Sequence, residues 1–563
     1  MRSTLRPAVF RFTAPLLFLA ASAFASGPYH IGSPNTVTAE PNVPRPSTTP
    51  CVVTLFSDFG FDNNYNLNPF SYTPPEDCPG PWAKVVLEVD INVTAGIQFD
   101  RTANIWLGGT NIFFGTTAEP GPTLAPSWHV ENDLTDYSPI FSVAQTGSIY
   151  LGNTVNSTYT GIQYATAKLE FYPLAPGQTA PVTANVVLPL SGGPTGGTVA
   201  LNTTSSTLSA TFSLPTNIQN AYLDVYSQGQ INDEFWYACV PNDVASELES
   251  CPNTGFRETE ITIDGTPAGV APVSPWIFTG GLGDPYLWFP IPGLQTLNFV
   301  PYRVDLTPFA GLLSNGSPHT VSLSVFNANS YFSDTASLLL YLDAGSTSVT
   351  GDVTENTLSS TPSPVTNENI NVGSTAITGT VSVGSNRNFV ISGYVNTSHG
   401  KVTTTLSQQV HFLNSQYFDI SNTEYVQNIN QASTVDSTTT VASPGQPTLT
   451  YLNQFGFPLV VDYAEVVFPS GAINVTTKTN QTYNLDQYTR QGGVFTYIGA
   501  LSDNAHHQDT LHFNSSGAFT GNTQSSSQTY NQTDTTGVNV SCTLAAANNV
   551  LTSYSPTCAG FEK

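Results

Sequence analysis

The sequence predicts an all-β protein built from sandwich domains. Segments that mix β-branched and aromatic residues recur along the chain with alternating polarity, and Gly, Pro and Asn separate them. We find no long stretch with the periodicity of an amphipathic helix. Short strands at regular spacing are typical of β-sandwiches. The clearest of these strand-like segments are residues 82–93, 104–114, 164–173 and 182–190.

The chain has 563 residues, which is too many for one hydrophobic core. A Pro/Gly-rich stretch at 173–181 and a Ser/Thr/Asn-rich stretch at 345–375 mark the expected boundaries. The predicted division is a signal peptide at 1–25, a Pro/Ser/Thr-rich linker or extended arm at 26–50, a first β-sandwich at 51–178, a second β-sandwich at 179–345 and a C-terminal β-rich domain at 346–563.

The N-terminus has the pattern of a secretion signal. Arg2, Arg6 and Arg11 form a positive region, an apolar run follows, and residues 23–25 (AFA) offer a small-x-small cleavage site. The apolar run is too short for a membrane anchor. We therefore expect a secreted protein, extracellular or periplasmic, without a membrane anchor. No sequence feature indicates an oligomer, so we expect a monomer.

Six cysteines agree with export, because disulfides persist in oxidising compartments. Six cysteines allow 15 pairings, and we favour the pairs nearest in sequence, each of which brackets a loop. These are Cys51 with Cys78, Cys239 with Cys251, and Cys542 with Cys558. Metal binding is the alternative, but no CxxC occurs. We interpret the adjacent His506 and His507 as solvated loop residues, and we predict no metal and no cofactor.

Charged residues make up only 9% of the chain, with 39 acidic against 14 basic residues and a formal net charge of −25. This balance argues against nucleic acid as a partner, because phosphates need a basic surface. A protein with few ion pairs also loses little stability when its carboxylates are protonated. We therefore expect a protein that works in acid. An ordinary secreted β-protein with a polar surface is the alternative.

The candidate active site consists of carboxylates that lie beside aromatic residues in predicted loops. Two carboxylates can run the hydrolysis of an amide or a glycoside, one activating water and the other donating a proton, and a nearby Arg can stabilise the oxyanion. We find no GxSxG, HExxH or phosphate-loop motif. All six tryptophans precede residue 290, and indole rings are common stacking partners for sugars. The tryptophans that we take as substrate-binding candidates are Trp128, Trp236, Trp276 and Trp288.

At these stretches the sequence resembles the type A peptide:N-glycanases, amidases that release whole N-linked glycans from asparagine. The resemblance rests on segments in family order, among them GIQFDRTANIWLGG, TTAEP, WHVENDLTDY, DEFWY, GFRETEITIDG and WIFTGGL. It covers residues 51–415 clearly, and the low charge is similar to that of the acid-active bacterial members. It implies N-glycosylated peptides or glycoproteins as substrates.

A fainter resemblance links the chain to the type F peptide:N-glycanases, which have two adjacent jelly-roll sandwiches. Their catalytic Asp lies in a Trp-Asp-Arg sequence, which matches Phe99, Asp100 and Arg101 here. The segment that carries a functional Glu in those enzymes matches CPNTGFRE, with Asn253 in the place of that Glu. Glu234 or Glu258 could supply the second carboxylate.

The resemblance implies a mechanism in which Asp100 activates water, Glu234 or Glu258 donates a proton and Arg257 stabilises the oxyanion. Arg101 and Glu119 join the tryptophans as expected substrate-binding residues. Two other classes of function remain open. One is a glycan-binding protein without catalysis, and the other is an endo-acting glycosidase on the N-glycan core.

Overall fold

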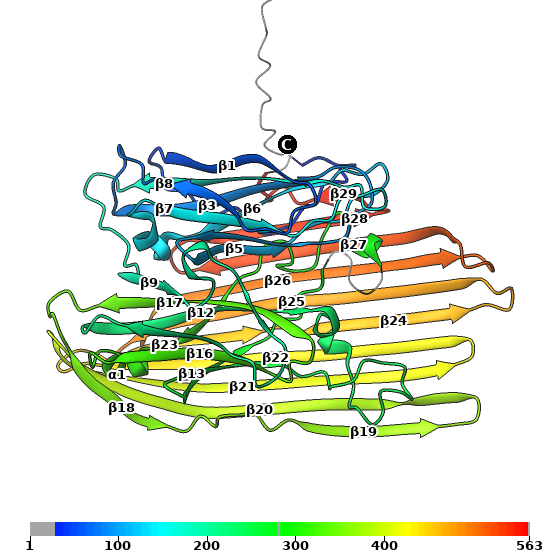
Figure 1. The fold of residues 1–563 in the computed structure, drawn as a ribbon. Coiled ribbons are helices and arrows are strands. Elements are labelled where there is room, and N and C mark those ends of the chain that lie inside the picture. Colours follow the sequence, from blue (N-terminus) through cyan, green and yellow to red (C-terminus); the bar gives the residue numbers. More distant parts are fainter. Residues whose placement is uncertain (1–28, 279–281, 283, 561–563) are drawn as a thin grey trace, which may run out of the picture.

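The computed structural model describes residues 29–278, 282 and 284–560, so the predicted signal peptide lies outside the described residues. The all-β prediction is confirmed. Strands of the described residues form five antiparallel sheets, and a single turn of α-helix, α1 (Ala310–Leu313), is present among them (Figure 1). None of the helices in these ranges is long and apolar enough to span a membrane.

The first sandwich pairs two four-stranded sheets, ordered β1-β8-β3-β6 and β2-β7-β4-β5. This order, with the last strand beside the first, is that of an eight-stranded jelly roll. Its strands are β1 (Cys51–Phe61), β2 (Asn68–Tyr72), β3 (Trp82–Val93), β4 (Thr102–Leu107), β5 (Thr110–Thr116), β6 (Ser127–Asp133), β7 (Gln145–Leu151) and β8 (Gln163–Pro173).

The second sandwich repeats the same topology, with sheets ordered β10-β17-β12-β15 and β11-β16-β13-β14 and with β9 added beside β17. The predicted pair of adjacent jelly rolls is therefore present. Its strands are β9 (Val186–Pro189), β10 (Val199–Leu201), β11 (Leu208–Ser213), β12 (Ile218–Gln230), β13 (Glu258–Ile263), β14 (Thr266–Pro272), β15 (Tyr302–Asp305), β16 (Pro318–Phe326) and β17 (Tyr331–Leu342).

The C-terminal part forms one twelve-stranded sheet of unusually long strands. Along β21 buried and exposed residues alternate, as expected when one face of a sheet is covered. Its strands are β18 (Thr350–Asn356), β19 (Val365–Val372), β20 (Ala376–Thr397), β21 (Gly400–Ser421), β22 (Glu424–Ala442), β23 (Leu449–Gly456), β24 (Leu459–Val467), β25 (Ile473–Gln491), β26 (Val494–Phe513), β27 (Phe519–Asp534), β28 (Asn539–Ala547) and β29 (Val550–Tyr554).

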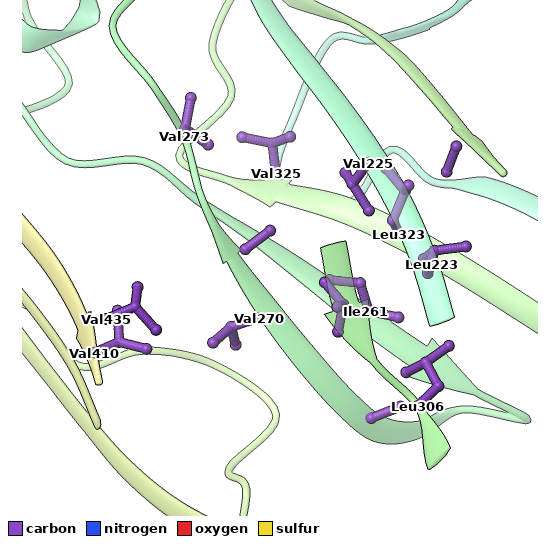
Figure 2. Packing of buried hydrophobic residues seen from close by; sticks show 14 of the residues in the cluster. Leu223, Val225, Ile261, Val270, Val273, Leu306, Leu323, Val325, Val410 and Val435 are labelled. Carbon is purple, nitrogen blue, oxygen red and sulfur yellow. The ribbon is translucent and has the colours of Figure 1, made fainter. Parts of the chain in front are cut away.

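The second sandwich packs on the covered face of this large sheet (Figure 1). The core of the second sandwich continues into the sheet without interruption, because Val410 and Val435 of the sheet belong to the same buried cluster as Val270 of β14. Figure 2 shows these valines beside the inner residues of the sandwich. The large sheet therefore acts as a third layer that covers apolar surface the second sandwich would otherwise expose.

Residues 29–50 form an extended arm that is packed against the rest of the protein. Val37 and Ala39 join an apolar cluster with β28 and β29. Farther along, the Arg45 guanidinium forms ion pairs with Glu88, Glu131 and Glu170 of the first sandwich. The arm therefore joins the first sandwich to the last strands of the large sheet.

Two of the three predicted cysteine pairs are confirmed, namely Cys239–Cys251 and Cys542–Cys558. The third prediction is wrong for this structure, because Cys51 and Cys78 are free thiols. They lie side by side, and Cys78 also donates a 3.6 Å hydrogen bond to the carbonyl oxygen of Phe171. Burial and the contact with Cys51 raise the pKa of the Cys78 thiol to about 11.

The adjacent histidines do not lie in a loop as predicted but within β26. His507 is buried in the interface with the second sandwich, where its Nε2 lies 3.0 Å from the carbonyl oxygen of Ile291. Burial lowers the pKa of His507 to about 4. Among the described residues, no group of His, Cys, Asp and Glu side chains is placed to hold a metal ion.

Candidate active site

A cavity of about 670 Å³ lies where the two sandwiches meet. The first sandwich contributes the start of β4 and part of β7, and the second contributes the end of β12, the start of β17 and the loop before β10. Its size falls in the range of ligand-binding pockets. Asp100, Arg101 and Glu234 line it together, so the structure brings three of the predicted site residues to one place.

Asp100 and Arg101 are held in place by backbone pairing and by one glutamine. The N–H of Arg101 donates to Thr117 Oγ1 at 2.8 Å, and the N–H of Thr117 donates back to the carbonyl oxygen of Arg101 at 3.0 Å. The Arg101 guanidinium donates to Gln98 Oε1 at 2.5 and 3.1 Å. These contacts fix the segment that leads into β4.

Glu119 lies behind Asp100. Its Oε1 accepts a 3.3 Å hydrogen bond from the N–H of Asp100, and its side chain is 8% exposed. Burial, followed by the negative charge of Asp100, raises the pKa of Glu119 to about 8. This shift favours the protonated form of Glu119, so that two negative charges do not lie side by side here.

Glu234 approaches from the second sandwich. Burial and the charge of Asp100 raise its pKa to about 8. It follows a short 3-10 turn, η3 (Ile231–Asp233), which turns back onto β12. Gly229 permits this close return, because a Cβ there would lie 2.2 Å from the carbonyl oxygen of Asp233. Ile231 has a φ of 53°, a costly conformation for a β-branched residue.

Arg257 does not line the cavity, so the structure does not support its predicted role in stabilising an oxyanion there. Its side chain is 1% exposed and pairs with Asp233, with the Nη2 2.8 Å from Oδ1. Its Nη1 donates to the carbonyl oxygens of Asn253, Thr254 and Phe256. The other Asp233 oxygen accepts the N–H groups of residues 329 and 330 at 2.8 and 2.7 Å. This buried pair fixes the turn that carries Glu234.

Glu258 is also separated from the cavity. It is buried at the start of β13 and pairs with Arg387 of β20 at 2.5 Å. Burial raises the pKa of Glu258 to about 7. The pair joins the second sandwich to the large sheet, so the structure does not support a catalytic role for Glu258. Asn253 lies in the same loop as Arg257, where its Nδ2 donates to the carbonyl oxygen of Asn327 at 2.7 Å.

The four predicted substrate-binding tryptophans are core residues. Trp128, Trp236 and Trp288 are each 1% exposed, and Trp276 is stacked on Phe299 with ring centroids 4.2 Å apart. None of them lines the cavity. The structure therefore does not support the expected stacking of these residues on sugars, because their rings are already covered by protein.

The aromatic residues at the cavity are others, which we did not predict as site residues. Trp106 lies on β4, which begins shortly after Asp100, and its indole N–H has no hydrogen-bond partner among the described residues. Phe99 and Tyr65 are half exposed at the mouth. The aromatic residues that line the cavity are Tyr65, Phe99, Trp106, Tyr150, Phe278 and Tyr331. The closeness of Trp106 to Asp100 in the sequence could have indicated that Trp106 is a site residue. No sequence feature indicates this for Tyr65, Tyr150 or Tyr331.

The fold and the cavity define a two-jelly-roll protein with a carboxylate-lined site between its sandwiches. Residues 39–359 match the family "Peptide N-acetyl-beta-D-glucosaminyl asparaginase amidase A". The chain is 34% identical over 394 residues to the "Peptide-N4-(N-acetyl-beta-glucosaminyl)asparagine amidase A" of Prunus dulcis, covering 66% of this chain and 67% of that protein. The chain belongs to the peptide:N-glycanase A family.

Solved structures are more distant. Recombinant peptide:N-glycanase F is 15% identical with a TM-score of 0.35, covering 52% of this chain and 96% of its own. The structure of PNGF-II in the P21 space group is 13% identical with a TM-score of 0.34, covering 52% of this chain and 66% of its own.

Proposed function

We propose that this protein is a secreted amidase that hydrolyses the bond between asparagine and an N-linked glycan. It releases the intact glycan and leaves aspartate in the peptide. Membership of the family supports this activity. The observation that carries the proposal is the meeting of Asp100 and Glu234, from different sandwiches, in one cavity.

The two carboxyl groups are suited to opposite roles in this reaction. Asp100 accepts a proton from water as the water oxygen attacks the amide carbon. Glu234, protonated below about pH 8, donates its proton to the amide nitrogen as the carbon–nitrogen bond breaks. The products are the aspartate side chain and a glycosylamine. No metal or cofactor takes part in these steps.

Arg101 is the proposed partner of the oxyanion in place of Arg257, because it lines the cavity beside Asp100. Glu119 is a positioning residue that holds the backbone of Asp100.

The raised pKa of Glu234 supports operation in acid, where this donor is fully protonated. Export is part of the proposal and is supported by the N-terminal sequence pattern and by two disulfides.

Mass spectrometry of an N-glycopeptide tests the function. Incubation with the protein at pH 4.5 and 7.5 should convert the glycosylated Asn to Asp and release a complete glycan, and the pH with the higher rate decides whether the enzyme is acid-active. A peptide that keeps one sugar on Asn would indicate an endoglycosidase instead. An unchanged glycopeptide at both pH values would refute catalysis and favour the glycan-binding alternative.

A further inference from the structure

A second hollow, of about 600 Å³, lies between the loop closed by the Cys239–Cys251 disulfide and the large C-terminal sheet. The sheet provides the hairpin end of β21 and β22 and the neighbouring part of β24. These strands continue beyond the second sandwich on the right of Figure 1. The lining side chains that matter here are Phe235, Glu249, Glu424, Tyr425, Gln427 and Tyr463.

The hollow adjoins the candidate active site. Glu234 lines the first cavity and the next residue, Phe235, lines the second. Consecutive Cα atoms are only about 3.8 Å apart, so a short stretch of chain separates the two spaces. The two spaces therefore adjoin the same short segment of the second sandwich.

The wall between the two spaces is the segment 237–239, which follows Phe235, and hydrogen bonds attach it firmly to the sheet. Amide side chains of β21 and β22 donate to three successive carbonyl oxygens of the wall. Asn414 donates to the carbonyl oxygen of Tyr237 at 2.8 Å, Gln427 to that of Ala238 at 2.9 Å, and Gln416 to that of Cys239 at 2.9 Å. The hollow is thus formed by groups held in fixed positions, as a binding site requires.

The chemistry of the hollow fits a carbohydrate. The rings of Tyr425 and Tyr463 meet edge to face with centroids 6.0 Å apart, and Phe235 adds a third ring. Such rings pack against the apolar faces of sugars. The carboxylate groups of Glu249 and Glu424 can accept hydrogen bonds from sugar hydroxyl groups. Neither Lys nor Arg is among the lining residues, so an anionic ligand is disfavoured.

The size of the substrate also calls for a second space. The proposed function releases a whole branched glycan, and a cavity of about 670 Å³ holds only the sugars nearest to asparagine. The outer sugars must lie against another part of the protein or remain in water.

We propose that the hollow between the Cys239–Cys251 loop and strands β21, β22 and β24 is a second carbohydrate-binding subsite that takes the outer sugars of the N-glycan. It rests on the proposed function, and it gives the C-terminal sheet a role in substrate recognition. The subsite discriminates between long and short glycans by binding, and takes no part in the chemical step.

The test is Tyr463→Ser, with Tyr417→Ser as the matched control. Tyr417 is a half-exposed tyrosine of β21 that does not line the hollow. Hydrolysis is compared on one peptide that carries either a two-sugar core or a branched mannose-containing glycan. Tyr463→Ser should lower kcat/KM for the branched substrate about tenfold, through KM, and leave the two-sugar substrate within about twofold. Tyr417→Ser should change neither.

Equal losses on both substrates, or none on either, would overturn the proposal. A loss that follows the length of the peptide instead of the glycan would assign the hollow to the peptide and also overturn it. Binding of a free branched mannose trisaccharide, measured by ligand-observed NMR, tests the hollow without catalysis. Binding should occur in the wild-type protein and in Tyr417→Ser but weaken in Tyr463→Ser. If the wild-type protein hydrolyses neither glycopeptide, the proposed function fails, and this binding result still decides on the hollow.

Discussion

The backbone N–H of Asp100 donates a 3.3 Å hydrogen bond to the carboxyl group of Glu119, which lies 19 residues later in the chain. Two acids are thereby placed side by side in a largely buried position. Two adjacent negative charges are unfavourable, and burial together with the charge of Asp100 raises the pKa of Glu119 to about 8, which favours its protonated form. Asp100, which lines the cavity, is the group that we propose as the base.

This relationship predicts different effects for two changes of Glu119. Glu119→Gln keeps an oxygen to accept the Asp100 N–H and an amide to donate, so kcat should fall by less than about tenfold. Glu119→Ala leaves the N–H without its acceptor and should lower kcat by about 100-fold or more. Steady-state kinetics on a glycopeptide distinguish them, and equal losses would contradict the positioning role.

Asp100→Asn should abolish turnover by a factor of about 10² to 10⁴ without unfolding the protein, because the amide cannot accept a proton from water. Circular dichroism and the thermal midpoint serve as controls for folding. Full turnover by this variant would show that Asp100 is not the base.

Glu234 should determine the alkaline side of the pH–rate profile. Its pKa is raised to about 8, so the donor proton is present below this pH and is lost as the pH rises through it. In the wild-type protein, kcat/KM should fall above about pH 8. In Glu234→Gln, activity should be much lower and this fall should vanish. A fall of the same shape in the variant would assign it to another group, with Glu119 the first to be examined.

The pair between Asp233 and Arg257 should matter for stability. Arg257→Gln leaves the Asp233 carboxylate buried without its cation and should lower the free energy of unfolding by about 3 kcal/mol. The control is Lys84→Gln, which breaks a more exposed pair with Asp133 and should cost less than about 1 kcal/mol. Denaturant unfolding measures both, and similar costs would contradict the structural importance of the buried pair.

Carboxyl pairs at the large sheet predict that the fold is more stable in mild acid than at neutral pH. Asp284 and Asp509 share a hydrogen bond that needs a proton, with Tyr463 nearby, and burial raises the pKa of Asp284 to about 7. Glu40 and Asp503 form a second such pair, both with raised pKa. Because the folded-state pKa values lie above the ordinary range, their stabilisation is complete below about pH 4 and is lost as the pH rises towards about 7.

The thermal midpoint should therefore drop by several degrees between pH 4.5 and 7.5. In Asp284→Asn the new amide can donate to Asp509 at any pH, while its oxygen still accepts the N–H groups of Tyr286 and Leu287. This variant should show a smaller drop. A midpoint that rises from pH 4.5 to 7.5 would contradict the role of these pairs.

Much of the fold follows from local patterns. The four segments that we predicted as strands overlap β3, β4, β5, β8 and β9, because alternation of side chains along a strand is written directly in the sequence. The local cysteine pairs Cys239–Cys251 and Cys542–Cys558 were also predictable. The single sheet of long strands was not, since strand pairing over many residues depends on neighbours distant in the chain.

The candidate site divides in the same way. Asp100 was found because its neighbours in sequence resemble a family motif. Arg257 and Glu258 were chosen for charge and position in the sequence, yet each is buried against a partner that only the fold supplies, Asp233 in one case and Arg387 in the other. The four tryptophans were chosen as sugar-binding residues but lie in the core. A large aromatic ring suits a core as well as a binding surface, so the sequence could not distinguish the two.

The sequence by itself determined the strand pattern, the family and the first catalytic candidate, because these depend on residues that lie close together in the chain. The tertiary structure decided which carboxyl group shares the cavity with Asp100, which arginine faces it and which aromatic rings line it. Burial and pKa depend on groups brought together by folding, here from two sandwiches and, at the second hollow, from the large sheet.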